Sequence, residues 1–240
     1  MSNSSLFSRS ISRKGLFSLG FLVLLSGCSS TSPDSDMGEG NSLETTSEAS
    51  QAPAISDIFT ASDRRVWYAV FDGIGKSSEI YMMYVVENGT VTLYKVNGYG
   101  IGLTLGDLQG YDDQAAINTI EQNVDRSFEE YGNLYDSYED CRAAQITDDQ
   151  TPEFILNTDE TGNNIQSETV ILQPDTDSYT TVLNIANGSS FVSGEVYDDV
   201  YRGFEMIPES GSRMKYIVTR DESFTAFSLD DFDSPNVVIN

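Results

Sequence analysis

The chain has 240 residues, of which 13 are Lys or Arg, 38 are Asp or Glu and none is His, so its formal net charge is −25. Nucleic acids and anionic lipid headgroups are held through Lys and Arg clusters, and we therefore expect no nucleic-acid partner. The absence of histidine also excludes Ser-His-Asp and Cys-His catalysis and the usual zinc sites.

Residues 1–27 have the pattern of a bacterial lipoprotein signal. Three basic residues precede an apolar run at residues 16–25, which suits export but is short for a membrane span of ~20 residues. The run ends in Leu25-Ser26-Gly27-Cys28, which matches the lipobox of bacterial lipoproteins. The sequence therefore predicts cleavage before Cys28 and lipidation of its thiol, with acyl chains such as palmitate anchoring the mature protein.

Two other interpretations of this segment fit less well. An uncleaved transmembrane anchor needs a longer apolar stretch, and this one is interrupted by Ser18, Gly20 and Ser26. An ordinary secretory peptide ends in an A-x-A-like site, which is absent here. We expect a protein held by lipid at the extracellular face of the cell membrane.

Residues 28–57 are rich in Ser, Thr, Glu, Gly and Pro and have few large apolar side chains. Such a stretch buries too little surface to offset its ordering entropy, so it is predicted to be a disordered tether, with a mean end-to-end distance of ~30 Å. Loss of residues 1–27, which contain three basic and no acidic residues, leaves a net charge of −28. The dispersed carboxylates favour a solvated surface over a specific site, although attraction to cations or a basic partner stays open.

Residues 58–240 are predicted to form one globular domain. Residues 65–71 (RVWYAVF) are apolar on both alternating faces, as in a strand covered on both sides. Residues 79–86 and 90–96 flank Asn88-Gly89, which favours the positive φ angles of a type I′ hairpin turn. That turn would pair Val86 with Val91, Tyr84 with Leu93 and Met82 with Lys95.

The main helix is predicted over residues 112–131. Its apolar side chains recur at intervals of three and four and make one stripe. Asp112 and Asp113 can cap the first amides, and Gly132 occupies the place of a left-handed C-cap.

After residue 148 the pattern predicts strands and turns. Asn187-Gly188 is expected to make a second tight turn before a return strand that begins at residues 191–192. The apolar residues of segment 200–207 fit the spacing of a helix as well as that of a strand. We expect a strand, because Gly203 and Pro208 both weaken a helix. The other expected strands are residues 153–157, 168–172 and 180–186 and a hairpin of 214–219 with 224–229. The expected fold class is α+β, a mostly antiparallel sheet with one main helix.

Several segments from about residue 65 to the C-terminus resemble uncharacterised surface lipoproteins of Gram-positive bacteria such as lactobacilli and streptococci. The matching segments are VWY at 66–68, ENGTVTLY at 87–94, LTLGDL at 103–108, TDETGN at 158–163, YRGF at 201–204, VTR at 218–220 and FSLD at 227–230. The resemblance implies a Gram-positive membrane location and a single domain, and it supplies no catalytic residue.

The sequence favours a non-enzymatic domain that binds an envelope protein or an extracellular ligand. No catalytic residue, cofactor site or metal site is predicted, and the contacts would come from exposed aromatic residues and from loops 97–111 and 157–167. With Cys28 acylated, Cys141 has no disulfide partner and is interpreted as a partly buried small residue.

Two alternatives remain. A glycoside hydrolase could work with two carboxylates alone, and its mark would be a pair ~5–9.5 Å apart in a cleft, one with a raised pKa. Calcium could bind the acidic turns at 159–163, 175–177 and 230–233, but none has the spacing of an EF-hand loop. We interpret these turns as ordinary turn formers.

Overall fold

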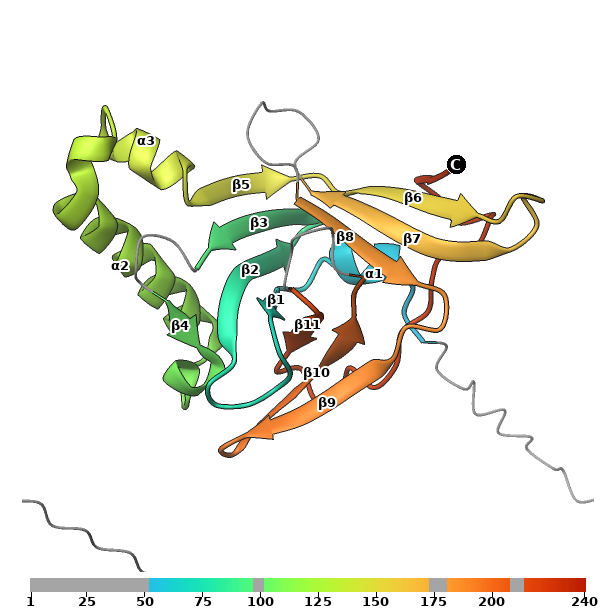
Figure 1. The fold of residues 1–240 in the computed structure, drawn as a ribbon, viewed down its shortest axis with the longest axis horizontal. Coiled ribbons are helices and arrows are strands. Elements are labelled where there is room, and N and C mark those ends of the chain that lie inside the picture. The colour runs from blue at the N-terminus through green and yellow to red at the C-terminus, as the bar shows by residue number, and fades with distance from the viewer. Residues whose placement is uncertain (1–51, 97–101, 173–180, 208–213) are drawn as a thin grey trace, which may run out of the picture. The chain divides into compact units, whose positions relative to one another are not determined.

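The computed structural model describes residues 52–96, 102–172, 181–207 and 214–240 (Figure 1). They belong to a compact unit that runs from Glu48 to Asn240. The fold class is α+β, mostly antiparallel sheet with one main helix, as the sequence predicted. The predicted signal segment, Cys28 and most of the predicted tether lie outside the described residues.

The larger sheet has eight strands, all paired antiparallel. Seven follow the order β5-β3-β2-β1-β11-β10-β9, and β4 pairs with the start of β2. Their bounds are β1 Arg65–Val70, β2 Glu79–Glu87, β3 Thr90–Lys95, β4 Leu103–Thr104, β5 Ile146–Gln150, β9 Phe191–Val196, β10 Asp199–Glu205 and β11 Tyr216–Thr219.

The smaller sheet has four strands in the order β12-β6-β7-β8. Its bounds are β6 Glu153–Thr158, β7 Ile165–Leu172, β8 Thr181–Ala186 and β12 Val237–Ile239. The C-terminal strand β12 runs parallel to β6, whereas the other pairs are antiparallel.

The helical segments are α1 Ile55–Phe59, η1 Leu105–Leu108, α2 Asp113–Tyr131, η2 Gly132–Leu134 and α3 Tyr138–Ala143. The main helix α2 begins where its capping residue predicts, because the Asp112 carboxylate accepts a hydrogen bond from the Ala115 N–H at 2.7 Å. Among the described residues, no helix is both long and apolar enough to cross a lipid bilayer.

Strand β1 divides the core between the two faces of the larger sheet. Tyr68 and its neighbours on alternate positions pack with the apolar stripe of α2, including Ile120. Trp67 and Ala69 point the other way, toward α1 and the inner face of the smaller sheet. The larger sheet is thus covered by α2 on one face and by α1 with the smaller sheet on the other, as Figure 1 shows.

The predicted hairpin is confirmed to the residue. Val86 pairs with Val91, Tyr84 with Leu93 and Met82 with Lys95. Asn88 and Gly89 both have positive φ angles, 53° and 80°, as a type I′ turn requires.

Three local predictions were wrong because tertiary contacts overrode the turn and cap signals. Residues 191–196 do not return along β8 after Asn187-Gly188, since β9 pairs with β10 in the other sheet. Phe224 is not in a strand, because the chain after β11 turns and crosses toward α1 instead. Gly132 has a right-handed φ of −58°, so α2 continues into a short 3-10 turn rather than ending in a left-handed cap.

The packed chain begins earlier than residue 58, where the sequence placed the start of the domain. Ile55 is fully buried, and its N–H donates to the Ser228 carbonyl at 3.1 Å. Ala54 forms an isolated bridge with the same residue. Residues 53–57 therefore belong to the domain and not to the tether.

Candidate functional site

Two buried acids meet between the smaller sheet, α1 and the C-terminal segment. Glu168 on β7 is 0% exposed and Asp230 is 2% exposed. The Asp230 N–H donates to Glu168 Oε2 at 2.9 Å, and the Asp230 carboxylate accepts from the N–H and hydroxyl of Ser56 at 2.8 and 2.5 Å. The pair therefore joins elements that lie 62 to 174 residues apart in the chain.

Burial, together with the adjacent Asp230 carboxyl, raises the pKa of Glu168 to about 8. Glu168 therefore holds its proton at neutral pH, while Asp230 has hydrogen-bond donors on both carboxylate oxygens. A raised pKa was one mark of a carboxylate enzyme, and the other mark was a cleft that holds both acids. Asp230 lines an open pocket of about 390 Å³, but Glu168 does not line it, and the two residues are 2% and 0% exposed. This pair fits a structural role better than catalysis.

The acidic turns behave as turn formers where they are described. The Asp159 carboxylate accepts bonds from Thr161, Asn163 and Asn164, and these donors hold its pKa well below its usual range. Asp230 is committed to Ser56, and residues 175–177 lie outside the described residues. No group of three or more acidic or cysteine side chains in the described part of the chain is arranged to hold a metal ion.

Cys141 lies fully buried on α3, where burial raises the pKa of its thiol. The Gln145 side-chain amide lies 3.2 Å from its Sγ. A neutral, enclosed thiol is a packing residue, which is the interpretation that the sequence favoured.

A charged and aromatic cluster lies where the end of β11 meets the start of α2. The Arg220 side chain is only 12% exposed, and its Nη2 lies 3.2 Å from Asp113 Oδ1 and 3.3 Å from the Tyr68 hydroxyl. Its Nη1 donates to the Tyr111 carbonyl, and its guanidinium lies 5.9 Å from the centre of the Tyr68 ring. Arg220 therefore fixes the loop before α2 against the sheet.

This cluster borders an open pocket of about 560 Å³, here named the Tyr111 pocket. It is lined by Tyr111, Asp112, Asp113, Gln114, Asp199 and Arg220. Tyr111 is 38% exposed, and the lining includes three aspartates and one arginine. A second pocket of about 350 Å³ shares Asp113 and Arg220 with the Tyr111 pocket and is lined in part by Arg64 and Arg65.

One polar atom near the Tyr111 pocket has no partner. The Tyr201 side chain on β10 is 0% exposed, and its hydroxyl has no hydrogen-bond partner among the described residues. Burial raises the pKa of Tyr201 to about 12, and the charges that act on it are those of Arg220, Asp199 and Asp113. All three residues line the Tyr111 pocket, but Tyr201 itself does not, and its hydroxyl is enclosed in the core.

Sequence analysis singled out none of these pocket residues as a site. Arg220 is 107 residues from Asp113 and 109 from Tyr111, so no local motif records their meeting. Of the predicted contact loops, 97–111 contributes Tyr111, whereas its residues 97–101 lie outside the described part. Cys28, the one site residue predicted, also lies outside it.

Comparison with known proteins returned no matching family model, no matching curated protein and no matching solved structure. The resemblance to Gram-positive lipoproteins therefore stays a prediction.

Proposed function

We propose that this chain is a lipid-anchored extracytoplasmic lipoprotein whose domain binds an envelope component or an extracellular ligand without catalysing a reaction. The anchor rests on Leu25-Ser26-Gly27-Cys28 after a basic and then apolar segment. The binding role rests on the Tyr111 pocket, where an exposed aromatic ring lies among several polar groups. That pocket is the observation that carries the proposal.

The runner-up, a carboxylate hydrolase, has less support. The one carboxyl group whose pKa is raised in the described residues is Glu168, and it is enclosed with Asp230 beneath the smaller sheet. A polysaccharide chain needs both acids at an open surface. The test is hydrolysis of a wall polymer by the purified protein. Activity that Glu168→Gln or Asp230→Asn abolishes without unfolding the protein would favour the hydrolase over the binding role.

The anchor is tested by Cys28→Ala. We expect the variant to accumulate unprocessed or to leave the membrane fraction, because it has no thiol to acylate. Ser26→Ala, which keeps a small residue at that position, is the matched control and should be processed normally. A Cys28→Ala protein that is still fully processed and needs detergent for extraction would contradict the anchor.

The binding role is tested by capture from envelope extracts. The full chain in detergent is compared with its Tyr111→Ala variant, and Tyr197→Ala is the control because Tyr197 is also exposed. We expect the bound material to fall with Tyr111→Ala alone. Equal capture by all three proteins would remove the Tyr111 pocket from the proposal.

A further inference from the structure

The first and last segments of the domain are bonded to each other. Residues 53–59, which contain α1, lie beside residues 227–230 near the C-terminus. The Ser228 N–H donates to the Pro53 carbonyl at 3.0 Å, and the Ser228 carbonyl accepts from the Ile55 N–H at 3.1 Å. We name these two segments together the terminal clamp.

The buried acid pair holds the terminal clamp on the smaller sheet. The N–H and hydroxyl of Ser56 in α1 donate to the Asp230 carboxylate, and the Asp230 N–H donates to Glu168 Oε2 on β7. A further hydrogen bond joins the Glu168 and Asp230 carboxyl groups to each other. Such a bond needs a proton on one of the two groups, because an ionised carboxylate only accepts. The contact between the clamp and the sheet therefore depends on that proton.

The described surroundings of Glu168 contain no positive charge that acts on it in place of the proton. Its cross-strand neighbours are Leu156 of β6 and Ile185 of β8, and both are apolar. The helix α1 presents the neutral Ser56. In the described residues, Asp230 is the only charged group that acts on Glu168, and Glu168 Oε1 has no hydrogen-bond partner. Two carboxylates at this place would repel each other with no cation between them.

The other acidic groups of this region lie at the surface. Asp57 and Asp231 are exposed, and Asp57 accepts from the Ala54 N–H. The open pocket of about 390 Å³ is lined by Asp230 and Asp231, so solvent comes close to the pair although both of its members are buried. Movement of the clamp away from β7 would bring water to both carboxyl groups, while the strands of the smaller sheet stay paired.

Opening has a cost that keeps the clamp closed while the proton is held, because Ile55, Ile58 and Phe59 of α1 are at most 1% exposed and pack in the core. We propose that the terminal clamp is a pH-dependent latch, closed while the acid pair holds its proton and opening, with both sheets still folded, as that proton is lost. Its opening would add residues 53–59 to the connection between the domain and the predicted anchor at Cys28. That consequence rests on the proposed anchor, whereas the latch itself does not.

Hydrogen exchange of backbone amides measures how often the clamp opens. The informative amides are those of Ser56 and Asp230, whose hydrogen bonds hold the clamp closed. Amides in the middle of β1 and β2 report unfolding of the whole domain. The full chain in a zwitterionic detergent is measured from about pH 5 to about pH 8, the range over which Glu168 ionises in the open clamp but not in the closed one. Each rate is divided by the intrinsic exchange rate at that pH.

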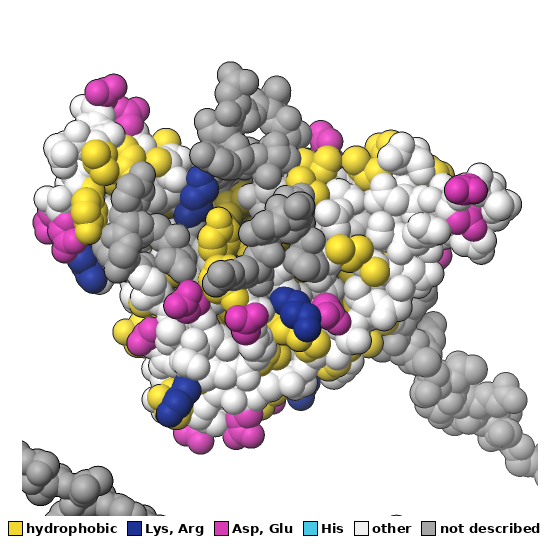
Figure 2. Space-filling view, viewed as in Figure 1, with side chains coloured by type: hydrophobic (Ala, Val, Ile, Leu, Met, Phe, Trp, Pro, Cys, Tyr) yellow, Lys and Arg dark blue, Asp and Glu magenta, His cyan; other side chains and the backbone are white. Residues whose placement is uncertain are grey.

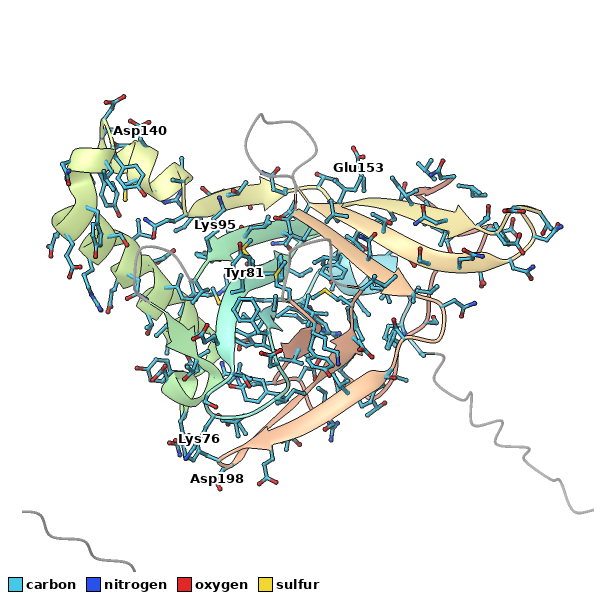
Figure 3. The ribbon with its side chains drawn as sticks, in the orientation of Figure 1. Lys76, Tyr81, Lys95, Asp140, Glu153 and Asp198 are labelled. Atoms are coloured by element: carbon cyan, nitrogen blue, oxygen red, sulfur yellow. The ribbon has the colours of Figure 1, made fainter. Side chains whose placement is uncertain are left out.

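We expect the clamp amides to exchange more readily than those of β1 and β2 at every pH. The open fraction of the clamp should rise about tenfold for each pH unit, because the open clamp releases a proton that the closed clamp holds. Glu168→Gln should remove this rise, since its side-chain amide is neutral throughout. Glu153→Gln is the matched control and should keep the rise, because Glu153 projects from the start of β6 into solvent (Figure 3).

Two outcomes in the unchanged protein alone would overturn the latch. One is exchange of the clamp amides only together with those of β1 and β2, which would mean that the clamp opens only when the whole domain unfolds. The other is an open fraction that stays constant between about pH 5 and about pH 8. An equal rise in Glu168→Gln would also overturn it, since the proton would then come from another group.

Discussion

The buried proton on Glu168 is the strongest electrostatic feature at the scale of single residues. The ordinary pKa of a glutamate is near 4.5, and in the folded protein it is raised to about 8. Between these values the unfolded chain ionises Glu168 while the folded chain keeps it neutral, so stability falls as pH rises. The stability that neutral Glu168 contributes is therefore fully present below about pH 4.5 and is lost above about pH 8.

Glu168→Gln should remove this part of the pH dependence. The amide is neutral at every pH, so the variant should gain stability relative to the unchanged protein between pH 5 and pH 8, by up to about 4 kcal/mol. The measurement is the free energy of unfolding in urea at both pH values.

Glu153→Gln on the adjacent strand β6 is the control, because Glu153 is exposed. It removes the same charge without removing a buried group. An identical pH dependence in Glu168→Gln and the unchanged protein would show that Glu168 is not held neutral in the fold.

The first helix, α1, matters at the scale of elements. Although it has only five residues, Ile55, Ile58 and Phe59 are all at most 1% exposed. Phe59 lies 6.4 Å from the Trp67 ring in the core. Ser56 also satisfies the buried Asp230 carboxylate, so α1 supports both the core and the acid pair.

Removing the start of α1 should destabilise the domain. A chain that begins at Ile58 loses Ile55 and Ser56, and we expect it to lose about 2–5 kcal/mol, the usual cost of removing a buried aliphatic side chain. A chain that begins at residue 52 keeps every described contact and should match the full protein. Thermal and urea unfolding of both chains measure the difference.

A single substitution separates packing from chain length. Ile55→Ala in the full chain should cause a similar loss. Asp57→Ala, which removes only an exposed carboxylate that accepts from the Ala54 N–H at 3.4 Å, should cost less, about 1 kcal/mol or below. If the chain from Ile58 melts like the chain from residue 52, the contacts of α1 before Ile58 contribute nothing measurable.

The net charge dominates at the scale of the whole molecule. Figure 2 shows acidic side chains scattered over the visible face with few basic ones between them. The ion pairs in the described residues are mostly at the surface, such as Arg142–Asp148, and surface pairs contribute little. Self-repulsion among the remaining carboxylates therefore opposes folding.

Salt should stabilise the domain. Raising NaCl from about 0.02 M to about 0.5 M shortens the Debye length from ~20 Å to ~4 Å and screens this repulsion, so the Tm should rise by a few degrees. Differential scanning calorimetry at fixed pH is the measurement. A Tm that falls with salt would mean that the surface ion pairs outweigh the repulsion.

The sequence by itself determined those parts of the fold that depend on neighbouring residues. Asn88-Gly89 specified the register of its hairpin because both residues tolerate positive φ, and the stripe of α2 specified the main helix. The run of apolar residues on both faces of β1 likewise indicated that both faces are covered. Local turn and cap motifs gave wrong predictions where the structure depends on residues far away in the chain. Examples are the expected C-cap at Gly132 and the expected return strand after Asn187-Gly188.

Only the tertiary structure decided which side chains meet. Glu168 and Asp230 are 62 residues apart, and Tyr111 and Arg220 are 109 residues apart. Neither pairing has a periodic or motif signature, because side-chain spacing along a strand or helix carries information only over a few residues. The sequence therefore indicated an anchor at Cys28, while the acid pair and the Tyr111 pocket arise from the way the two sheets, α1 and α2 pack together.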